Sequence, residues 1–251
     1  MNLLLFTKNN ETYYPFVRVL PKYFDNILIV QSEICTKIDG FSVVEHRNID
    51  NNNYQNFLKT LKSFSPDIII SFFYNKKIEN KILNLCKYAV NFHGSLLPDY
   101  AGPHALNWQI INGEEKSGVT IHELTPEIDG GNIIFQEEFK ILQKDTAQDV
   151  LEKNIELSSK MLKSLLHGLI QKNLPSKKQN KNGNEHICKL RKPEDGEVLK
   201  GMSVKNIYDM ARALVDPWPG IFYFDKNNKK ITINNKITLG KAEEIFNIIN
   251  C

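Results

Sequence analysis

The sequence predicts an α/β fold: an open, mostly parallel sheet covered by helices, with a small C-terminal α+β extension. Short apolar runs alternate with longer amphipathic stretches over the first two thirds of the chain. Several of these runs are apolar at nearly every position, which is typical of parallel strands covered on both faces. A polar stretch at 173–185 then separates off a shorter C-terminal part. We therefore predict one domain at 1–175 and a second, small domain at 186–251.

The strands of the main sheet are predicted from apolar runs between polar residues. These runs lie at 3–6, 27–30, 41–44, 67–70 and 88–92, and two further strands are expected at 118–123 and 132–141. In sheets of this kind, ligands bind beyond the carboxyl ends of the strands. Residues that directly follow a strand are therefore the first candidates for a functional site.

Helical spacing of apolar residues predicts helices at 54–64, 78–87 and 146–171. Ser203 is a suitable N-cap for a further helix at 203–215. The run Asp216-Pro217-Trp218-Pro219-Gly220 must end that helix, because proline cannot continue it. Short strands at 221–224 and 229–239 are expected to complete the chain, with Asn-rich turns between them.

Composition predicts an ordinary water-soluble protein. The net charge is +3, with 41% hydrophobic and 24% charged residues, so no strong electrostatic field indicates nucleic acid or a membrane surface. From Pro175 onward lysine and arginine are in excess, which suits either an anionic partner or a solvated surface. We see no apolar run long enough to span a membrane and no secretory leader. We therefore expect a cytoplasmic location.

Cysteine usage and missing motifs narrow the function further. Cys35, Cys86, Cys188 and Cys251 form no CxxC pair and are expected to be reduced thiols. No GxGxxG follows the first strand, and GxxxxGK[ST] is absent from the chain. Neither a Rossmann-type dehydrogenase nor a P-loop NTPase is therefore indicated.

The segment Asn91-Phe92-His93-Gly94-Ser95-Leu96-Leu97-Pro98 ends the strand predicted at 88–92 with polar residues. Side chains two apart on a strand share a face, so Asn91 and His93 point the same way. An amide can stabilise an oxyanion, and an imidazole can accept a proton near neutral pH. The pair therefore suits acyl transfer. The alternative interpretation is a turn-capping Asn beside a structural, half-buried His.

A second polar segment, Glu127-Ile128-Asp129-Gly130-Gly131, follows the strand predicted at 118–123. The two glycines permit a tight turn and close approach of a ligand to the backbone. An Asp before Gly-Gly is on its own typical of a turn, so function and turn formation both remain open for Asp129.

Together these segments resemble a known family. Asn-x-His-x-Ser-Leu-Leu-Pro, followed by Gly-Val-Thr-x-His at 118–122 and Asp-Gly-Gly-x-Ile at 129–133, is similar to the 10-formyltetrahydrofolate-dependent formyltransferases. The resemblance is strong over residues 64–139 and weaker elsewhere. It implies a formyltransferase Rossmann-like fold and catalytic roles for Asn91, His93 and Asp129.

The resemblance also implies the donor site and the chemistry. The co-substrate would be 10-formyltetrahydrofolate, with no metal. Its contacts would come from two segments, namely Phe72, Phe73, Tyr74 and Ile78, and Leu124, Glu127 and Ile128. Strand-end packing is an equal alternative for Phe72, Phe73 and Tyr74. Asn91 and His93 would stabilise the tetrahedral oxyanion, and Asp129 would orient His93 and assist proton movement.

Within this family, the short C-terminal part with Asp216-Pro217-Trp218-Pro219-Gly220 resembles the nucleotide-sugar N-formyltransferases. The implied acceptor is dTDP-4-amino-4,6-dideoxyglucose or a related nucleotide-linked 4-amino sugar, used for lipopolysaccharide O-antigen. Methionyl-tRNA formyltransferases carry a larger C-terminal domain, and formyltetrahydrofolate hydrolases carry an extra N-terminal one. Both remain as alternatives.

Candidate acceptor contacts are Lys77 for a diphosphate, Tyr100, and the aromatic residues Trp218 and Tyr223 for stacking on a base. Packing in the core of the small domain is at least an equal alternative for Trp218, as it is for Phe222. The short strands near 221–239 could also pair across two chains, which would give a homodimer. A metal hydrolase using His93, His104, His122 and Asp129 is a weaker alternative, because no HExxH-type spacing supports it.

Overall fold

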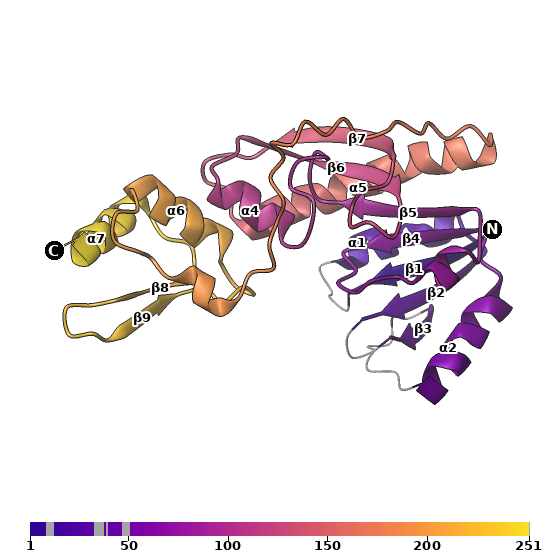
Figure 1. Ribbon diagram of the computed structural model, residues 1–251, viewed down its shortest axis with the longest axis horizontal. Coiled ribbons are helices and arrows are strands. Elements are labelled where there is room, and N and C mark those ends of the chain that lie inside the picture. The colour runs from indigo at the N-terminus through magenta and orange to yellow at the C-terminus, as the bar shows by residue number, and fades with distance from the viewer. Residues whose placement is uncertain (9–12, 33–37, 39, 47–50, 251) are drawn as a thin grey trace.

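The computed structural model describes residues 1–8, 13–32, 38, 40–46 and 51–250. The predicted open sheet is confirmed (Figure 1). Seven strands lie in the order β3-β2-β1-β4-β5-β6-β7. They are β1 (Asn2–Thr7), β2 (Asn26–Gln31), β3 (Ser42–Glu45), β4 (Ile68–Phe72), β5 (Tyr88–His93), β6 (Lys116–Glu123) and β7 (Ile133–Lys140). The first five are parallel, whereas β6 and β7 each run antiparallel to the preceding strand.

Helices cover both faces of this sheet. The helical elements are α1 (Tyr14–Val17), η2 (Leu20–Lys22), α2 (Asn51–Phe64), α3 (Asn80–Leu83), α4 (Ala105–Ile111), α5 (Ala147–Ile170), η3 (Pro193–Gly196), α6 (Val204–Ala213) and α7 (Leu239–Asn250). The long helix α5 begins at a capping box, in which the Thr146 side chain accepts from Asp149 N and the Asp149 carboxylate accepts from Thr146 N. This cap fixes the start of α5 where the sequence predicts it.

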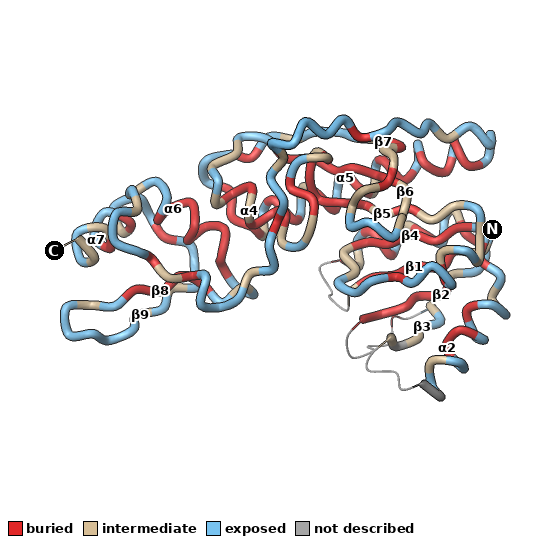
Figure 2. Tube along the Cα trace, in the orientation of Figure 1, coloured by how far each residue is buried: buried red, intermediate tan, exposed pale blue. Residues whose placement is uncertain are grey.

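Alternation along the strands builds one apolar core on each face. On one face Leu5, Ile70 and Val90 pack with α1 and α5, and on the other Leu4 and Ile69 pack with α2 and α3. The buried strands and the exposed outer turns are visible in Figure 2. Complete burial of the central strands on both faces explains why their sequences are continuously apolar.

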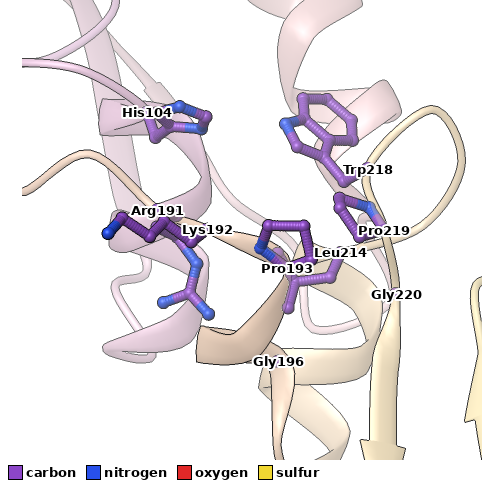
Figure 3. Close-up of a pocket in the computed structure, with 9 residues that line it drawn as sticks. All are labelled: His104, Arg191, Lys192, Pro193, Gly196, Leu214, Trp218, Pro219 and Gly220. Carbon is purple, nitrogen blue, oxygen red and sulfur yellow. The ribbon is translucent and has the colours of Figure 1, made fainter.

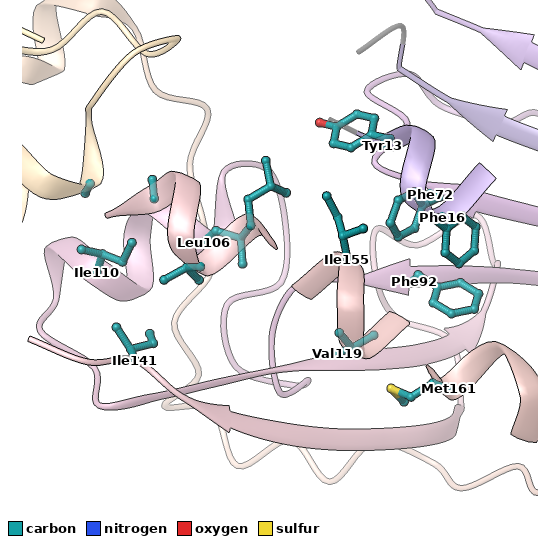
Figure 4. Close-up of a cluster of buried hydrophobic side chains, with 14 of the residues drawn as sticks. Tyr13, Phe16, Phe72, Phe92, Leu106, Ile110, Val119, Ile141, Ile155 and Met161 are labelled. Atoms are coloured by element: carbon teal, nitrogen blue, oxygen red, sulfur yellow. The ribbon is translucent and has the colours of Figure 1, made fainter. Parts of the chain in front are cut away.

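Aromatic rings fill the first core near the ends of β4 and β5. Phe16 stacks on Phe72 with ring centroids 4.1 Å apart, and Phe92 meets both rings edge-on (Figure 4). Phe92 thus packs on the face opposite Asn91 and His93, as the strand period predicts.

One predicted helix is shorter than expected, and two helices were not predicted. The helix predicted at 78–87 is limited to α3, because the chain must turn back into β5 at Tyr88. Helix α4 was not predicted, since its seven residues follow a proline-containing loop and are too few for a clear period. Helix α7 starts at Leu239, where a strand was expected to end; β9 (Lys230–Ile233) is shorter than predicted.

The C-terminal elements gather in a lobe at one end of the molecule (Figure 1). In this lobe β8 (Ile221–Phe224) pairs antiparallel with β9, α6 packs against α7, and α6 also packs against α4 of the main body. The other edge of β8 already pairs with Glu197 through Phe222, so any pairing between two chains through this hairpin would have to use the outer edge of β9.

The polar segment predicted as a linker is exposed over most of its length, but it is attached to the main body. It pairs with β7 through Ile133 and Lys177 and with the loop after β5 through Ala101 and Ile187. In Figure 1 it follows β7 and then descends past α4 to the C-terminal lobe. Among the described residues, no helix combines the length and apolarity needed to cross a membrane. Cys86 and Cys188 are free thiols, while Cys35 and Cys251 lie outside the described residues.

Candidate active site

Asn91 and His93 lie on the same face at the carboxyl end of β5, as predicted. The His93 ring is buried, and its Nε2 lies 2.8 Å from the carbonyl oxygen of Tyr100. A carbonyl can only accept, so Nε2 carries the hydrogen and Nδ1 is the nitrogen that can take a proton. This second nitrogen faces Asp129 Oδ2 at 3.4 Å.

Asp129 lies in the turn between β6 and β7 and points back at the end of β5. Its Oδ2 accepts the Gly102 N–H at 2.8 Å, and its Oδ1 lies 3.4 Å from Asn91 Nδ2. The backbone of Asp129 is left-handed, with φ +47°. A side chain at Gly131 would place Cβ 1.9 Å from Glu123 O, so this turn requires glycine there. Asp129 is therefore both a turn residue and part of the site.

His122 is a further member of the site. The sequence interpretation placed it in the Gly-Val-Thr-x-His motif and in the metal alternative, but gave it no role in formyl transfer. It pairs with Asn91 across the β5–β6 ladder. Its Nδ1 lies 2.8 Å from the Glu123 carbonyl oxygen and therefore donates to it, which leaves Nε2 to accept the Asn91 N–H at 3.1 Å. The same Nε2 is 3.3 Å from Asp129 Oδ1. The available signal was the antiparallel register, which puts His122 opposite Asn91.

The surroundings of His93 and Asp129 shift the pKa values of both groups. Burial, together with the His122 ring, lowers the pKa of His93 below its ordinary value, although Asp129 acts in the opposite direction. Burial alone would raise the pKa of Asp129, but the His93 and His122 rings and the Gly102 N–H outweigh it and hold that pKa well below its usual range. At neutral pH the site therefore presents a neutral imidazole beside a charged carboxylate.

The residues of the first segment that were predicted to contact the donor differ in how far they are buried. Phe72 is completely buried in the aromatic core, and Ile78 is buried in the core under α2. Phe73 has φ +51° and stacks on Tyr13 at 4.9 Å, while Tyr74 bonds to the His46 ring. Strand-end packing accounts for the side chains of Phe72 and Ile78. Only Phe73 and Tyr74 are left partly exposed at the strand end.

The second segment predicted to contact the donor directly borders the Asp129 carboxylate. Leu124 bonds through its backbone N–H to Ala89 O, which fixes the segment to β5. Glu127 pairs with Lys181 at 2.8 Å. Ile128 is 76% exposed although it is apolar and adjacent to Asp129. An apolar side chain held in the open next to the site is available to a ligand.

The predicted acceptor contacts are not brought together in one place. Lys77 is exposed, and Tyr100 is buried with its hydroxyl bonded to Glu114 and Asn112. Tyr223 is buried in the core of the C-terminal lobe. Trp218, by contrast, lines a cavity of about 180 Å³ between the main body and the lobe.

Several residues that line this cavity were not predicted from the sequence to contact the acceptor. Figure 3 shows His104 on one side and Trp218 on the other, with Arg191 and Lys192 nearby. Burial lowers the pKa of His104, and the positive charges of Arg191 and Lys8 lower it further. Arg191 and Lys192 in the lining therefore bring positive charge to this cavity. His93, His122 and Asp129 do not line this cavity.

An α/β sheet that presents an amide, a neutral imidazole and a charged carboxylate at its strand ends defines an enzyme of the acyl-transfer class. Residues 30–166 match the family model described as formyl transferase. The chain is also 37% identical over 205 residues to the bifunctional polymyxin resistance protein ArnA of Wigglesworthia glossinidia brevipalpis. That match covers 81% of this chain and 31% of ArnA, so the chain spans less than a third of this relative's length. The protein belongs to the formyl transferase family, which confirms the resemblance seen in its motifs.

Solved structures agree on the fold. A 4-N formyltransferase from Francisella tularensis is 19% identical, with a TM-score of 0.74 and coverage of 94% of this chain and 98% of that chain. WlaRD, a sugar 3N-formyl transferase solved in the presence of dTDP and 5-N-formyl-THF, is 23% identical, with a TM-score of 0.66 and coverage of 86% and 79%. At these identities the likeness concerns the architecture.

Proposed function

We propose that this protein transfers a formyl group from 10-formyltetrahydrofolate to the amine of a nucleotide-linked 4-amino sugar, with dTDP-4-amino-4,6-dideoxyglucose as the first candidate. The observation that carries the proposal is the convergence of Asn91, His93 and Asp129 at one strand end. Membership of the formyl transferase family and the sugar N-formyltransferases among its structural neighbours support it.

The residues beside Asp129 suit a folate donor. Exposed Ile128, next to Asp129, and the partly exposed ring of Phe73 at the end of β4 offer apolar surface for a flat ring system. The donor supplies an activated formyl carbon when it is bound. A tetrahydrofolate with the formyl group on a different nitrogen was present in the WlaRD structure, which supports the same class of donor here.

In this proposal each side chain has a separate role in the addition of the amine to the formyl carbon and the elimination of the folate nitrogen. The Asn91 amide donates to the carbonyl oxygen as it becomes negative, and its longer contact, 3.4 Å to Asp129, is the one that can be exchanged. Nδ1 of His93, neutral and turned toward the carboxylate, accepts a proton from the attacking amine. Asp129 stabilises the imidazolium that forms, and the Tyr100 carbonyl, which accepts the Nε2 hydrogen, keeps the ring in this tautomer. As the tetrahedral intermediate collapses to the new amide, the bond from the formyl carbon to the folate nitrogen breaks, and the imidazolium gives its proton to that nitrogen.

The cavity between the main body and the lobe suits the phosphates and base of the acceptor. Arg191 and Lys192 provide cations, and Trp218 provides a flat ring beside them (Figure 3). The neighbouring His104 follows Gly102, whose N–H holds Asp129, so the loop connects this cavity to the catalytic carboxylate. A nucleoside diphosphate in the cavity would therefore direct its sugar toward Asn91 and His93.

Incubation with 10-formyltetrahydrofolate and a panel of dTDP- and UDP-linked amino sugars tests the function. Mass spectrometry should show one sugar that gains the mass of a carbonyl group, with Asn91→Ala as the inactive control. Formylation of methionyl-tRNA instead, or release of formate without transfer, would overturn the proposed acceptor.

Arg191→Met tests the acceptor cavity, because it keeps much of the side-chain stem and removes the charge. We expect the KM for the nucleotide sugar to rise about tenfold or more, as for the loss of one charge-assisted hydrogen bond. The KM for the donor should be unchanged. Lys189→Met, an exposed neighbour, is the matched control. Equal KM values in both variants would contradict the assignment of the cavity.

A further inference from the structure

One buried amide outside the catalytic trio contacts the backbone of the Asp129 turn. Gln179 lies in the segment predicted as a linker, yet it is only 8% exposed. Its Nε2 donates to Asp129 O at 2.6 Å and to Gly131 O at 2.8 Å. One carboxamide thus uses both of its hydrogens to connect the two sides of Gly130.

We propose that Gln179 is a positioning residue for formyl transfer, which holds the Asp129 turn so that its carboxylate faces both His93 and His122. The inference rests on the family's formyl-transfer activity and on no particular acceptor. Asp129 adopts a left-handed backbone, which is uncommon for residues with a side chain, although aspartate takes it more readily than most. The two bonds from Gln179 support this backbone from outside the turn.

The hydrogen bonding of Gln179 indicates that the two hydrogens on its Nε2 are the groups that hold the Asp129 turn. Its Oε1 is buried and has no hydrogen-bond partner among the described residues. Burying a polar atom without a hydrogen-bond partner costs free energy, and a methionine of similar size at this position would avoid that cost. The two hydrogen bonds to the carbonyl groups of Asp129 and Gly131 therefore explain why an amide is buried at this position.

The rest of the segment at 177–188 secures the position of Gln179. On one side Lys177 and Ile133 exchange backbone hydrogen bonds at 2.8 and 2.9 Å, which places the segment along β7. On the other side Tyr100 N donates to His186 O, and Cys188 N donates to Ala101 O, both at 2.7 Å. The same segment therefore contacts the turn that carries Asp129 and the loop whose Tyr100 carbonyl orients His93.

Gln179→Met removes the donors and keeps the volume. We expect kcat to fall on the order of 10–100-fold, the size of effect that a displacement of about 1 Å in a catalytic group produces. The KM for the acceptor should change little. The matched control is Lys178→Met on the exposed neighbour, which should keep wild-type kcat. A kcat for Gln179→Met within twofold of wild type would overturn the proposal.

Gln179→Glu separates positioning from general loss of structure. A carboxylate cannot donate to the carbonyl groups of Asp129 and Gly131, whereas a protonated carboxyl can donate to one of them. The nearby charged groups are Asp129 itself and the Lys181–Glu127 pair. The ratio of the variant's kcat to that of wild type should therefore rise as pH falls, with Asn180→Asp as control. A ratio that does not change with pH would count against the positioning role.

A readout without substrates keeps this inference separate from the proposed function. Titration of the histidine ring resonances by NMR should show a lower pKa for His93 in Gln179→Met than in wild type, because Asp129 raises that pKa and would be displaced. An unchanged His93 pKa would overturn the inference. Failure of the wild-type protein to formylate any amino sugar would instead disprove only the proposed acceptor.

Discussion

Two buried carboxylates in this molecule are held in opposite ways. Asp209 on α6 is 3% exposed and receives Arg212 Nε at 2.8 Å on one oxygen and Lys205 Nζ on the other. Asp129 is also largely buried, but its neighbours are two imidazoles, an amide and a backbone N–H. Among the residues that the structure describes, no lysine or arginine forms an ion pair with Asp129.

The difference explains which carboxylate can do chemistry. The charge of Asp209 is already neutralised, and Arg212 uses another nitrogen to bind Asp145 O at 2.8 Å, so the group ties α6 to the main body. The charge of Asp129 is supported by hydrogen bonds and remains available to stabilise a positive charge on His93, as the proposed proton transfer requires. A permanent cation next to Asp129 would have cancelled that effect.

Asp129→Asn should have the largest effect on catalysis. The amide can still accept the Gly102 N–H but cannot stabilise an imidazolium, so kcat should fall by about 10²–10⁴. The free energy of unfolding should stay close to that of wild type, as measured by chemical denaturation. Substantial unfolding of this variant at neutral pH would mean that Asp129 has a structural role like that of Asp209.

Asp209→Asn is the matched change in the other region and should give the reverse pattern. It leaves the buried guanidinium of Arg212 without its counter-charge, and breaking a buried pair in this way costs ~3–5 kcal/mol of stability. Below its unfolding transition the variant should retain kcat within a few-fold of wild type. A large loss of kcat in fully folded protein would show that α6 also controls the site.

The same comparison shows what the sequence could predict. The sequence predicted Asn91 and His93 as a pair because side chains two apart on a strand share a face. It predicted Asp129 because its motif resembles a known family. Asp209 carried no such signal, and the motif that contains His122 did not assign a role to it. Their roles depend on contacts between separate elements: the β5–β6 register for His122, and the packing of α6 against the body for Asp209.

The segment at 173–185 illustrates a further limit. Its polar composition correctly indicated exposure, but backbone hydrogen bonds to β7 leave no trace in side-chain polarity. Gln179 is one amide among many polar residues there, so its burial could not be foreseen. Helix α4 was missed because its seven residues give weak periodicity. Helix α7, with twelve residues, was missed because the interpretation ended with a strand at 229–239.

The pH dependence of kcat gives the smallest but most specific effect. Burial and His122 lower the pKa of His93, so its proton-accepting form is present above that lowered pKa and is lost as pH falls through it. With both substrates saturating, the acid limb of wild type should therefore lie below pH 6.5, the ordinary value for histidine.

Variants of the two neighbours should move this limb in opposite directions. His122→Gln removes a group that lowers the pKa of His93, so the limb should shift to higher pH. Asp129→Asn removes a group that raises it, so the residual activity should persist to lower pH than in wild type. Shifts in the same direction would show that the limb belongs to a group other than His93, and that His93 is not the residue that accepts the proton.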